Sequence, residues 1–553
     1  MLKATATGLA APPGFSGTFR QDDAARAVYG EGAGIARFHP RAVAVPASEA
    51  DVVALVRGAR KHRLPLIPRG SGSGMAGGGI GDGVIVDLSR LRAMGSVDAA
   101  RRCIRVGPGI LRGEVDRAAR AVGLRFPVDP SSGEFCTVGG MASTNAAGAH
   151  TLRHGAMRPW VRALRCVFDD GSIAEVRRGQ APPAEVPAIA RFLSDAHAPV
   201  VAGEQSAPAV HADVRKNSSG YATADYARSG ELVDLLVGSE GTLAIFTELE
   251  LSLEPVPAAT ASLLGAFATL EQAVDAAVQA RAAGAAACEL LDRTFLDVAA
   301  SGGVEMPIPA GTEAVLLAEV EAPSAGEASA AAQRLEHAFR AAGATHVALA
   351  LDADAEHRLW ALRHAASPIL SRLDPSLKSM QFIEDGAVPP ARLPDYVRGV
   401  RAALERHGVR GVIFGHAGDA HVHVNPLIDV RLPDWHERLR ALLDDVVALT
   451  ASLGGTLAGE HGDGRLRTPL LHAVWSDAVR ERFALVKSCF DPLGVLNPGV
   501  KVPLPGEQPV GEVKYDPALP ALPPAAARAL ATVERDRAYA TYRLALLDSP
   551  GGS

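Results

Sequence analysis

Residues 64–79 read LPLIPRGSGSGMAGGG, a short apolar run followed by a loop with six glycines between Gly70 and Gly79. Because glycine has no Cβ, such a loop lets backbone N–H groups approach an anion closely, and a pyrophosphate is its natural guest. A structural turn would also explain a single loop of this kind. The Rossmann pattern does not fit, because no amphipathic helix and later acidic ribose ligand follow within a compact βαβ unit.

The sequence around this loop alternates predicted strands with a predicted helix. Ser48 and Asp51 have the spacing of a helix N-cap before DVVALVRGARKH, residues 51–62. A DG turn at Asp170–Gly171 joins two β-like runs. The predicted strands are AVAVP (42–46), LPLIP (64–68), GVIVDLS (83–89), CIRVGPG (103–109) and the two halves of LRCVFDDGSIAEV (164–176). We expect a first domain over residues 38–255, after an N-terminal extension of residues 1–37.

The composition changes after EPVPAA, residues 254–259, to alanine-rich helical patterns that alternate with strands. This alternation predicts an α+β domain over residues 256–501, with helices on one face of a second sheet. Its later strands are predicted at SMQFIEDG (379–386), GVIFG (411–415) and HVHVNPLI (421–428). Residues 502–553 form a proline-rich tail that ends in a short charged helix.

The composition limits the class of protein. A chain of 553 residues exceeds one hydrophobic core, and a net charge of −6 with a pI near 6.3 gives no basic footprint for nucleic acid. The cysteines are too scattered for an iron–sulfur or zinc cluster, so we expect buried thiols in a reducing compartment. They are Cys103, Cys136, Cys166, Cys288 and Cys489. Neither a signal peptide nor a transmembrane stretch is recognisable, so a cytoplasmic location is expected; peripheral membrane attachment is compatible with it.

Two further segments combine glycines with small hydroxyl residues. VDPSSGEFCTVGGMASTNAAG occupies residues 128–148, and LLVGSEGTLAIFTELEL occupies residues 235–251. Their small side chains suit close approach to a phosphate or to the edge of an isoalloxazine. Any one of the three glycine segments could be a tight turn, but all three together require another explanation.

These segments, KNSSGY (216–221) and FDPLGVLNPGVK (490–501) occur in the order found in the vanillyl-alcohol-oxidase superfamily. The chain resembles its D-lactate and D-2-hydroxyglutarate dehydrogenase branch over residues 38–501. The resemblance implies a two-part FAD-binding domain of the PCMH type, a ferredoxin-like substrate domain whose last part returns to the FAD domain, and a short helical C-terminal segment. The glycine loop lacks the histidine to which some relatives attach FAD, so non-covalent FAD is expected. The implied FAD contacts are Arg69, Gly70, Ser71, Gly72, Ser73, Gly74, Thr137, Gly140, Ser143, Thr144, Gly148, Gly241 and Asn497.

Histidines and a carboxylate gather at GHAGDAHVHVNP (415–426) and GEHGDGR (459–465). Imidazoles with a carboxylate suit zinc or another borderline divalent ion, although scattered polar loop residues would be the simpler interpretation of any single histidine. The resemblance selects His416, His423 and Glu460 as metal ligands and His461 as the catalytic base. Relatives commonly read GDGN where this chain has an additional histidine, His421, which could compete for the metal. The GEHGDGRLR form is similar to a subgroup whose longer members carry an iron–sulfur module, for which this chain lacks the cysteines.

A 2-hydroxy carboxylate requires a fixed cation, and a guanidinium can hold it bidentately. The resemblance places Arg363 of LWALR in this role, with Ser367, Lys378 and Asn425 as further substrate contacts. Without that resemblance, Arg363 would be read as part of a solvated helix face.

The expected function is FAD- and metal-dependent oxidation of D-2-hydroxyglutarate or D-lactate to the 2-oxo acid. In this hypothesis the metal polarises the C2 hydroxyl, His461 removes its proton, and hydride passes to flavin N5. A metal-dependent hydrolase and a non-catalytic flavin-binding subunit of a larger oxidase complex are the alternatives. The sequence does not select among a quinone, a cytochrome, an electron-transfer flavoprotein and an iron–sulfur protein as electron acceptor, and it is compatible with a homodimer.

Overall fold

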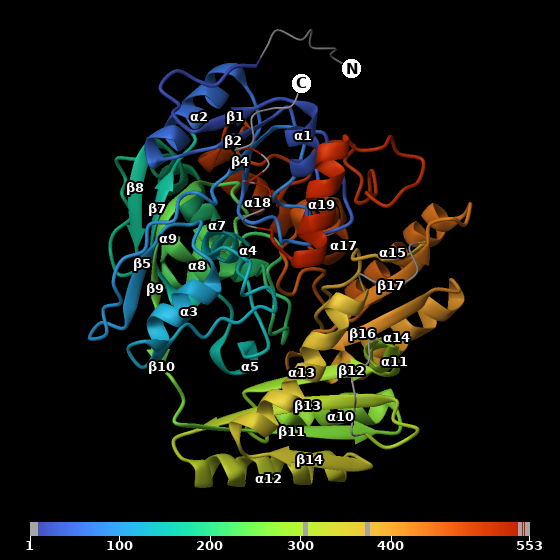
Figure 1. Cartoon of the computed structure of the whole chain (residues 1–553). Coiled ribbons are helices and arrows are strands. Elements are labelled where there is room, and N and C mark those ends of the chain that lie inside the picture. The colour runs from blue at the N-terminus through green and yellow to red at the C-terminus, as the bar shows by residue number, and fades with distance from the viewer. Residues whose placement is uncertain are drawn as a thin grey trace.

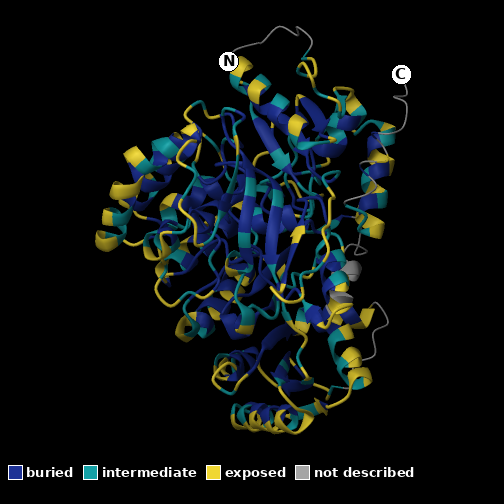
Figure 2. Ribbon diagram, turned by 90° about the vertical axis from the view of Figure 1, so that its left-hand side faces the viewer, coloured by how far each residue is buried: buried dark blue, intermediate teal, exposed yellow. Residues whose placement is uncertain are grey.

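A computed structural model describes residues 9–301, 308–370 and 376–539, with Arg543, Ala545 and Leu547 beyond them; the side chains of residues 364–370 lie outside this description. The described residues form two four-stranded sheets, a seven-stranded sheet and the two-stranded pair β6 (Leu124–Arg125) and β10 (Glu254–Pro255). Strands fill the interior, and exposed residues gather on the outer faces of helices (Figure 2). The α+β class that the sequence predicts is confirmed.

The first sheet has the strand order β1-β2-β4-β3, with β2, β4 and β3 parallel. Helix α2 (Glu49–His62) crosses from β2 to β3, and its N-cap Ser48 accepts a hydrogen bond from the backbone N–H of Asp51, as the sequence predicts. The strands are β1 (Thr18–Arg20), β2 (Ala42–Val45), β3 (Leu66–Arg69) and β4 (Val84–Asp87). The glycine-rich loop therefore begins at the end of β3, an edge strand of this sheet.

The second sheet is antiparallel, in the order β5-β9-β7-β8. The predicted DG turn joins β7 to β8 as a hairpin. Its strands are β5 (Cys103–Val106), β7 (Val161–Val167), β8 (Ile173–Arg177) and β9 (Ile245–Ser252). The helical segments between them are α3 (Arg112–Arg120), α4 (Val138–Thr144), α5 (Thr151–His154), η1 (Arg158–Trp160), α6 (Pro187–Arg191), the π-turn η2 (Phe192–Ala196), α7 (His197–Ser206), α8 (Thr223–Ser229) and α9 (Leu232–Leu236).

The third sheet is antiparallel in the order β14-β11-β13-β12-β16-β17-β15. Its first four strands follow the ferredoxin-like βαββαβ order, which the resemblance implied, and three later strands extend it. The strands are β11 (Ala259–Phe267), β12 (Ala287–Asp292), β13 (Ala314–Ala322), β14 (His346–Ala350), β15 (Leu377–Ser379), β16 (Arg410–Gly415) and β17 (His423–Asp429). The helices are α10 (Leu270–Ala280), α11 (Arg293–Ser301), α12 (Ala325–Ala341), α13 (Ala353–Leu370), η3 (Pro390–Arg392), α14 (Leu393–Arg406), η4 (Ala417–Asp419) and α15 (Trp435–Ser452).

Helices cover both faces of this sheet, so the expectation of helices on one face is wrong. Helices α10, α12, α14 and α15 pack on one face, and α11 and α13 pack on the other. The physical reason is visible in β12, where all six residues of ACELLD are buried. A strand buried on both faces needs a partner on each side.

The prediction of a strand over SMQFIEDG, residues 379–386, is also wrong beyond Ser379, where β15 ends. The remainder is a loop that carries Glu384 and Asp385 into the interior, where both are buried. The two carboxylates accept hydrogen bonds from neighbouring histidine rings and backbone N–H groups, which a strand ladder would not allow at both positions.

After α15 the chain returns to the first two sheets. Leu66 of β3 donates its backbone N–H to Val495, and Asn497 donates back to Leu66. The short helices that lead there are α16 (Gly464–Arg467), η5 (Thr468–Leu470), α17 (Leu471–Val474) and α18 (Asp477–Phe490). Helix α19 (Pro524–Asp536) lies beside α1 (Asp23–Tyr29), and both supply buried residues to one apolar cluster (Figure 1).

All five cysteines are buried and free, as expected from their scattered positions. Within the described ranges, no helix combines the length and apolar character needed to span a bilayer.

The packing of α12 on the seven-stranded sheet gives a stability prediction. Phe339 of α12 is fully buried, contacts Phe267 edge-on at 5.9 Å and fills the space above Gly265. We expect Phe339→Ala to lower the free energy of unfolding by about 3–5 kcal/mol, because it leaves a cavity. Arg334→Ala, an exposed position on the same helix, is the control and should change it by about 0.5 kcal/mol at most. Equal urea midpoints for the two variants, followed by circular dichroism, would contradict this packing.

Candidate active site

One cavity of about 440 Å³ connects the glycine-rich segments with the histidine cluster. Its wall includes most of the residues expected to contact FAD: Arg69, Gly70, Ser71, Gly72, Ser73, Gly74, Thr137, Gly140, Ser143, Thr144 and Gly241. The other two, Gly148 and Asn497, are not among the residues that line the cavity. The Gly148 carbonyl accepts a hydrogen bond from Lys216, and the Asn497 amide donates to the carbonyls of Gly78 and Glu240.

The glycine loop presents backbone donors to this cavity. From Ser71 to Gly79, the backbone N–H groups donate no hydrogen bond to any other described residue. The carbonyls of Ser71 and Gly72, in contrast, accept hydrogen bonds from Arg543 and from the N–H of Ala33. Because buried backbone donors need partners, a loop of this form fits a bound anion such as the pyrophosphate of FAD.

The other two glycine segments meet this loop. Helix α4 begins at the N-cap Thr137, whose hydroxyl lies where a Cβ on Gly70 would be. Gly241, with φ of +70°, packs against Pro68 of β3. Close backbone approach therefore explains why glycine is present at both positions.

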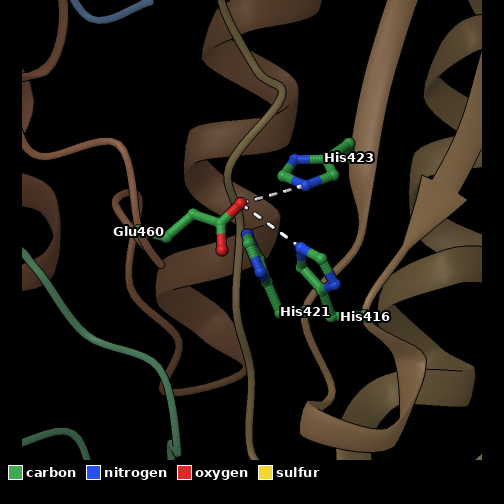
Figure 3. Close-up of side chains that lie close together, drawn as sticks. All are labelled: His416, His421, His423 and Glu460. Carbon is green, nitrogen blue, oxygen red and sulfur yellow. Dashed lines mark hydrogen bonds and ion pairs between the residues drawn. The ribbon is translucent and has the colours of Figure 1, made fainter. Parts of the chain in front are cut away.

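Two histidine side chains converge on one carboxylate oxygen at the other end of the cavity. His416 follows β16, His423 begins β17, and Glu460 lies in the loop after α15. The Nε2 atoms of both histidines are 3.3 Å from Glu460 Oε1 (Figure 3). His416 donates its Nδ1–H to Glu289, and His423 donates its Nδ1–H to the carbonyl of Glu384.

These outer hydrogen bonds determine what the cluster can hold. With Nδ1 donating, the Nε2 atom of each neutral ring directs a lone pair toward an oxygen that also carries lone pairs. Such an arrangement requires a proton or a cation between the groups, and histidines held by outer acceptors are typical of metal ligands. Burial alone would lower the pKa of His416, but Glu289 raises it to about 9, so the ring takes up a proton when no cation is bound.

His421 adds a further nitrogen to the cluster. Its Nε2 is 2.9 Å from Asp385, and its buried Nδ1 has no hydrogen-bond partner in the described structure. Burial lowers its pKa to about 3, so the ring is neutral. Ligand atoms of His416, His421, His423 and Glu460 all lie within 4.8 Å of one another. The donor set therefore fits a divalent metal of the zinc type.

His461 lies beside this cluster and faces the cavity. Its ring stacks on His423 at 5.3 Å with an interplanar angle of 9°, its Nδ1 is 3.2 Å from Glu384, and its Nε2 is 3.6 Å from Glu460. Burial alone would lower the pKa of His461, but Asp385 and Glu384 raise it to about 9.

Arg467 holds the two carboxylates that orient His461. It forms ion pairs with Glu384 and with Asp385, and all three side chains are buried. Burial would raise the pKa of each carboxylate, but Arg467 and His461 keep both pKa values below their usual range. The His461 imidazole is therefore fixed by ionised groups on its outer side.

Lys216 neutralises Glu460 from the side opposite the histidines. Its buried ammonium is 3.1 Å from Glu460 Oε2 and donates to the Gly148 carbonyl at 2.9 Å. The pKa of Glu460 is well below its usual range; burial acts against this, but Lys216 and His416 outweigh burial.

Arg363 of α13 also faces the cavity. Its Nε donates to Glu289 at 2.7 Å, and its guanidinium lies over the Phe414 ring at 5.1 Å. Lys378 and Asn425 line the same cavity. Ser367, the fourth expected substrate contact, lies among the residues whose side chains are not described.

The sequence did not assign roles to five residues of this site: Lys216, Glu289, Glu384, Asp385 and Arg467. Two signals were available in the sequence. Glu289 lies within the apolar strand ACELLD, and Glu384 and Asp385 follow the apolar run QFI. Charges in buried segments are rarely tolerated without a function. Lys216 begins the quoted motif KNSSGY, and Arg467 ends GEHGDGRLR.

Comparison with known proteins supports the same grouping. Residues 256–500 match the C-terminal domain of FAD linked oxidases, and residues 40–177 match an FAD binding domain. The D-lactate dehydrogenase of Archaeoglobus fulgidus is 30% identical over 461 residues, which are 83% of this chain and 90% of that protein. The glycolate oxidase subunit GlcD of Escherichia coli (strain K12) is 28% identical and covers 84% of each chain.

A D-2-hydroxyglutarate dehydrogenase of Escherichia coli (strain K12) is 29% identical over 89% of this chain, but the match spans only 51% of that protein. Among solved structures, the 4-ethylphenol oxidase of Gulosibacter chungangensis superposes with a TM-score of 0.64 at 15% identity, covering 88% of this chain and 95% of that one. This likeness shows the fold. The chain belongs to the FAD-linked oxidases of the vanillyl-alcohol-oxidase superfamily.

Proposed function

We propose that this protein is an FAD- and metal-dependent dehydrogenase that oxidises a small D-2-hydroxy acid to the 2-oxo acid. The observation that carries the proposal is the meeting of two features in one cavity: the glycine loop with its unpaired amides, and the cluster of His416, His423, Glu460 and His461. A hydrolase would have no use for the first feature, and a non-catalytic flavin subunit would have no use for the second.

FAD would be held by the glycine loop and by the segments around α4 and Gly241, without a covalent bond because the loop contains no histidine. A metal would be held by His416, His423 and Glu460, with His421 within reach as a fourth ligand. When bound, FAD provides the electron acceptor, and a divalent cation stabilises the negative charge that develops on an alcohol oxygen.

The residues of this chain then have separate tasks. Oxidation of a 2-hydroxy acid removes the hydroxyl proton, together with a hydrogen and its two electrons from C2. His461 takes the proton in its neutral form, which a cation bound at Glu460 would favour, because its ring lines the cavity outside the proposed set of metal ligands and is held on its outer side by Glu384. Arg363 binds the substrate carboxylate, and Glu289 fixes the direction of its guanidinium.

Lys378 favours a substrate with a second carboxylate. Its ammonium lines the cavity over the ring of Tyr515 and makes no ion pair with any described residue. A cavity with both Arg363 and Lys378 therefore suits a dicarboxylate such as D-2-hydroxyglutarate better than D-lactate or glycolate.

Anaerobic mixing tests the proposed reaction. We expect D-2-hydroxyglutarate to bleach the flavin absorbance of the purified protein faster than D-lactate, and the L-enantiomers to leave it unchanged. Removal of the metal by a chelator should stop the bleaching, and its return should restore it. A protein that cannot be reconstituted with FAD would overturn the proposal.

Two substitutions separate metal binding from proton transfer. We expect His461→Ala to slow flavin reduction by roughly 10²–10⁴-fold while the metal content stays at the wild-type level. Glu460→Gln should lose the metal, because it removes the charged oxygen on which the histidines converge. Metal analysis of both purified variants and stopped-flow reduction check this. Wild-type reduction by His461→Ala would exclude this residue as the base.

The role of Lys378 is tested by substrate preference. We expect Lys378→Gln to lower kcat/KM for D-2-hydroxyglutarate by roughly 10-fold or more, as loss of a charged contact does, and to change D-lactate oxidation much less. The control is Arg358→Gln, which removes an exposed cation from α13. An equal loss for both acids would show that Lys378 does not bind the distal carboxylate.

A further inference from the structure

The chain beyond residue 500, where the family match ends, lies against the FAD end of the cavity. Val513 pairs with Ala36 in an isolated bridge, and Lys514 donates to the carbonyl of Gly32. Tyr515, Glu534, Arg537 and Tyr539 line the cavity. The described part of this C-terminal tail therefore packs on the rest of the protein and forms part of the cavity wall.

Arg543 is a buried side chain of this tail. It is 2% exposed and donates to the carbonyl of Ser71 at 3.0 Å and to that of Glu31 at 3.3 Å. Arg69, which ends β3, is 3% exposed and also donates to Glu31. A Cβ on Gly72 would overlap Arg69 and lie 2.6 Å from an Arg543 nitrogen, so both guanidinium groups adjoin the same loop residue.

These two buried cations have no ion-pair partner among the described residues, although the charge of Asp87 acts on the pKa of both. Neither forms an ion pair with a described carboxylate, and the Nε atom of each is buried without a partner. The nearest acidic groups are engaged elsewhere: Asp87 accepts from Tyr29, and Glu31 pairs with Arg37. Burial lowers the pKa of both arginines, that of Arg69 to about 9, and their mutual repulsion adds to the effect for Arg69. Adjacent buried cations are costly unless an anion compensates them.

Arg543 also sets the direction of the loop. Because its guanidinium binds the Ser71 carbonyl, the N–H of the same trans peptide group points away from Arg543. This N–H belongs to Gly72, one of the unpaired donors that border the cavity.

Tyr539 and Arg537 close the cavity nearby. The Tyr539 ring stacks on Phe135 at 5.4 Å, and the Arg537 guanidinium lies over Phe135 at 5.9 Å. Phe135 belongs to the second glycine segment, so the tail bridges two of the segments assigned to FAD.

We infer that residues 512–539 and Arg543 complete the FAD site, with Arg543 as the positioning residue that orients the glycine loop and balances the charge of the pyrophosphate. This inference rests on the proposed placement of FAD. It assigns a cofactor-binding role to a part of the chain outside both matched domains.

Flavin binding to the deflavinated full-length protein tests this role independently of turnover. We expect Arg543→Gln to weaken FAD binding by roughly 10- to 100-fold, the loss typical of buried charge-assisted hydrogen bonds. Binding of riboflavin, which has no phosphate, should be unchanged, as measured by quenching of its fluorescence. Arg543→Lys, which keeps the charge but loses the two-carbonyl geometry, should fall between Arg543→Gln and the wild type.

The matched control is Arg528→Gln, which removes an exposed arginine from α19 of the same tail and should bind FAD like the wild type. Wild-type FAD affinity in Arg543→Gln, or an equal loss for riboflavin and FAD, would overturn the inference and leave the proposed reaction standing. Failure of the wild-type protein to bind FAD would instead overturn the proposed function.

Discussion

The buried carboxylate of Glu460 is the constraint on which the site depends. A carboxylate removed from water is stable only if other charges or hydrogen bonds replace its hydration. Here the replacements come from distant parts of the chain. Lys216 approaches from the segment between α7 and α8, and His416 and His423 approach from two neighbouring strands of the seven-stranded sheet. The position of this one side chain therefore ties the segment between α7 and α8 to the seven-stranded sheet.

Further buried charges fix the orientation of the side chains that surround Glu460. Glu289 joins Arg363 to His416, so the group proposed to bind the substrate and a proposed metal ligand share one fully buried carboxylate. Arg467 similarly joins Glu384 and Asp385, which in turn hold His461 and His421. Each imidazole thus has one nitrogen fixed by an outer acceptor and the other directed inward. This arrangement decides which ring nitrogens can bind a metal or accept a proton.

The family comparisons and the geometry answer different questions. Relatives at about 30% identity include proteins named for D-lactate, glycolate and D-2-hydroxyglutarate, so similarity to them does not identify the substrate. The proposed choice rests instead on Lys378, which lines the cavity over the ring of Tyr515, a residue of the tail beyond the matched domains.

The sequence by itself determined the α+β class, the strands on either side of the glycine loop, the FAD family and the identity of the cluster at residues 416–423 and 460–461. These follow from local patterns: glycines where a backbone must approach closely, alternating apolar runs and short motifs of fixed spacing. Only the tertiary structure decided that helices cover both faces of the large sheet, that SMQFIEDG is mostly loop, and that Lys216, Glu289 and Arg467 belong to the site. The reason is that a buried charge is recognised by its partners, and those of Glu460 and Asp385 are up to 244 and 82 residues away along the chain. Arg543 is the extreme case, since it contacts Ser71 across 472 residues and no local pattern distinguishes it from a surface arginine.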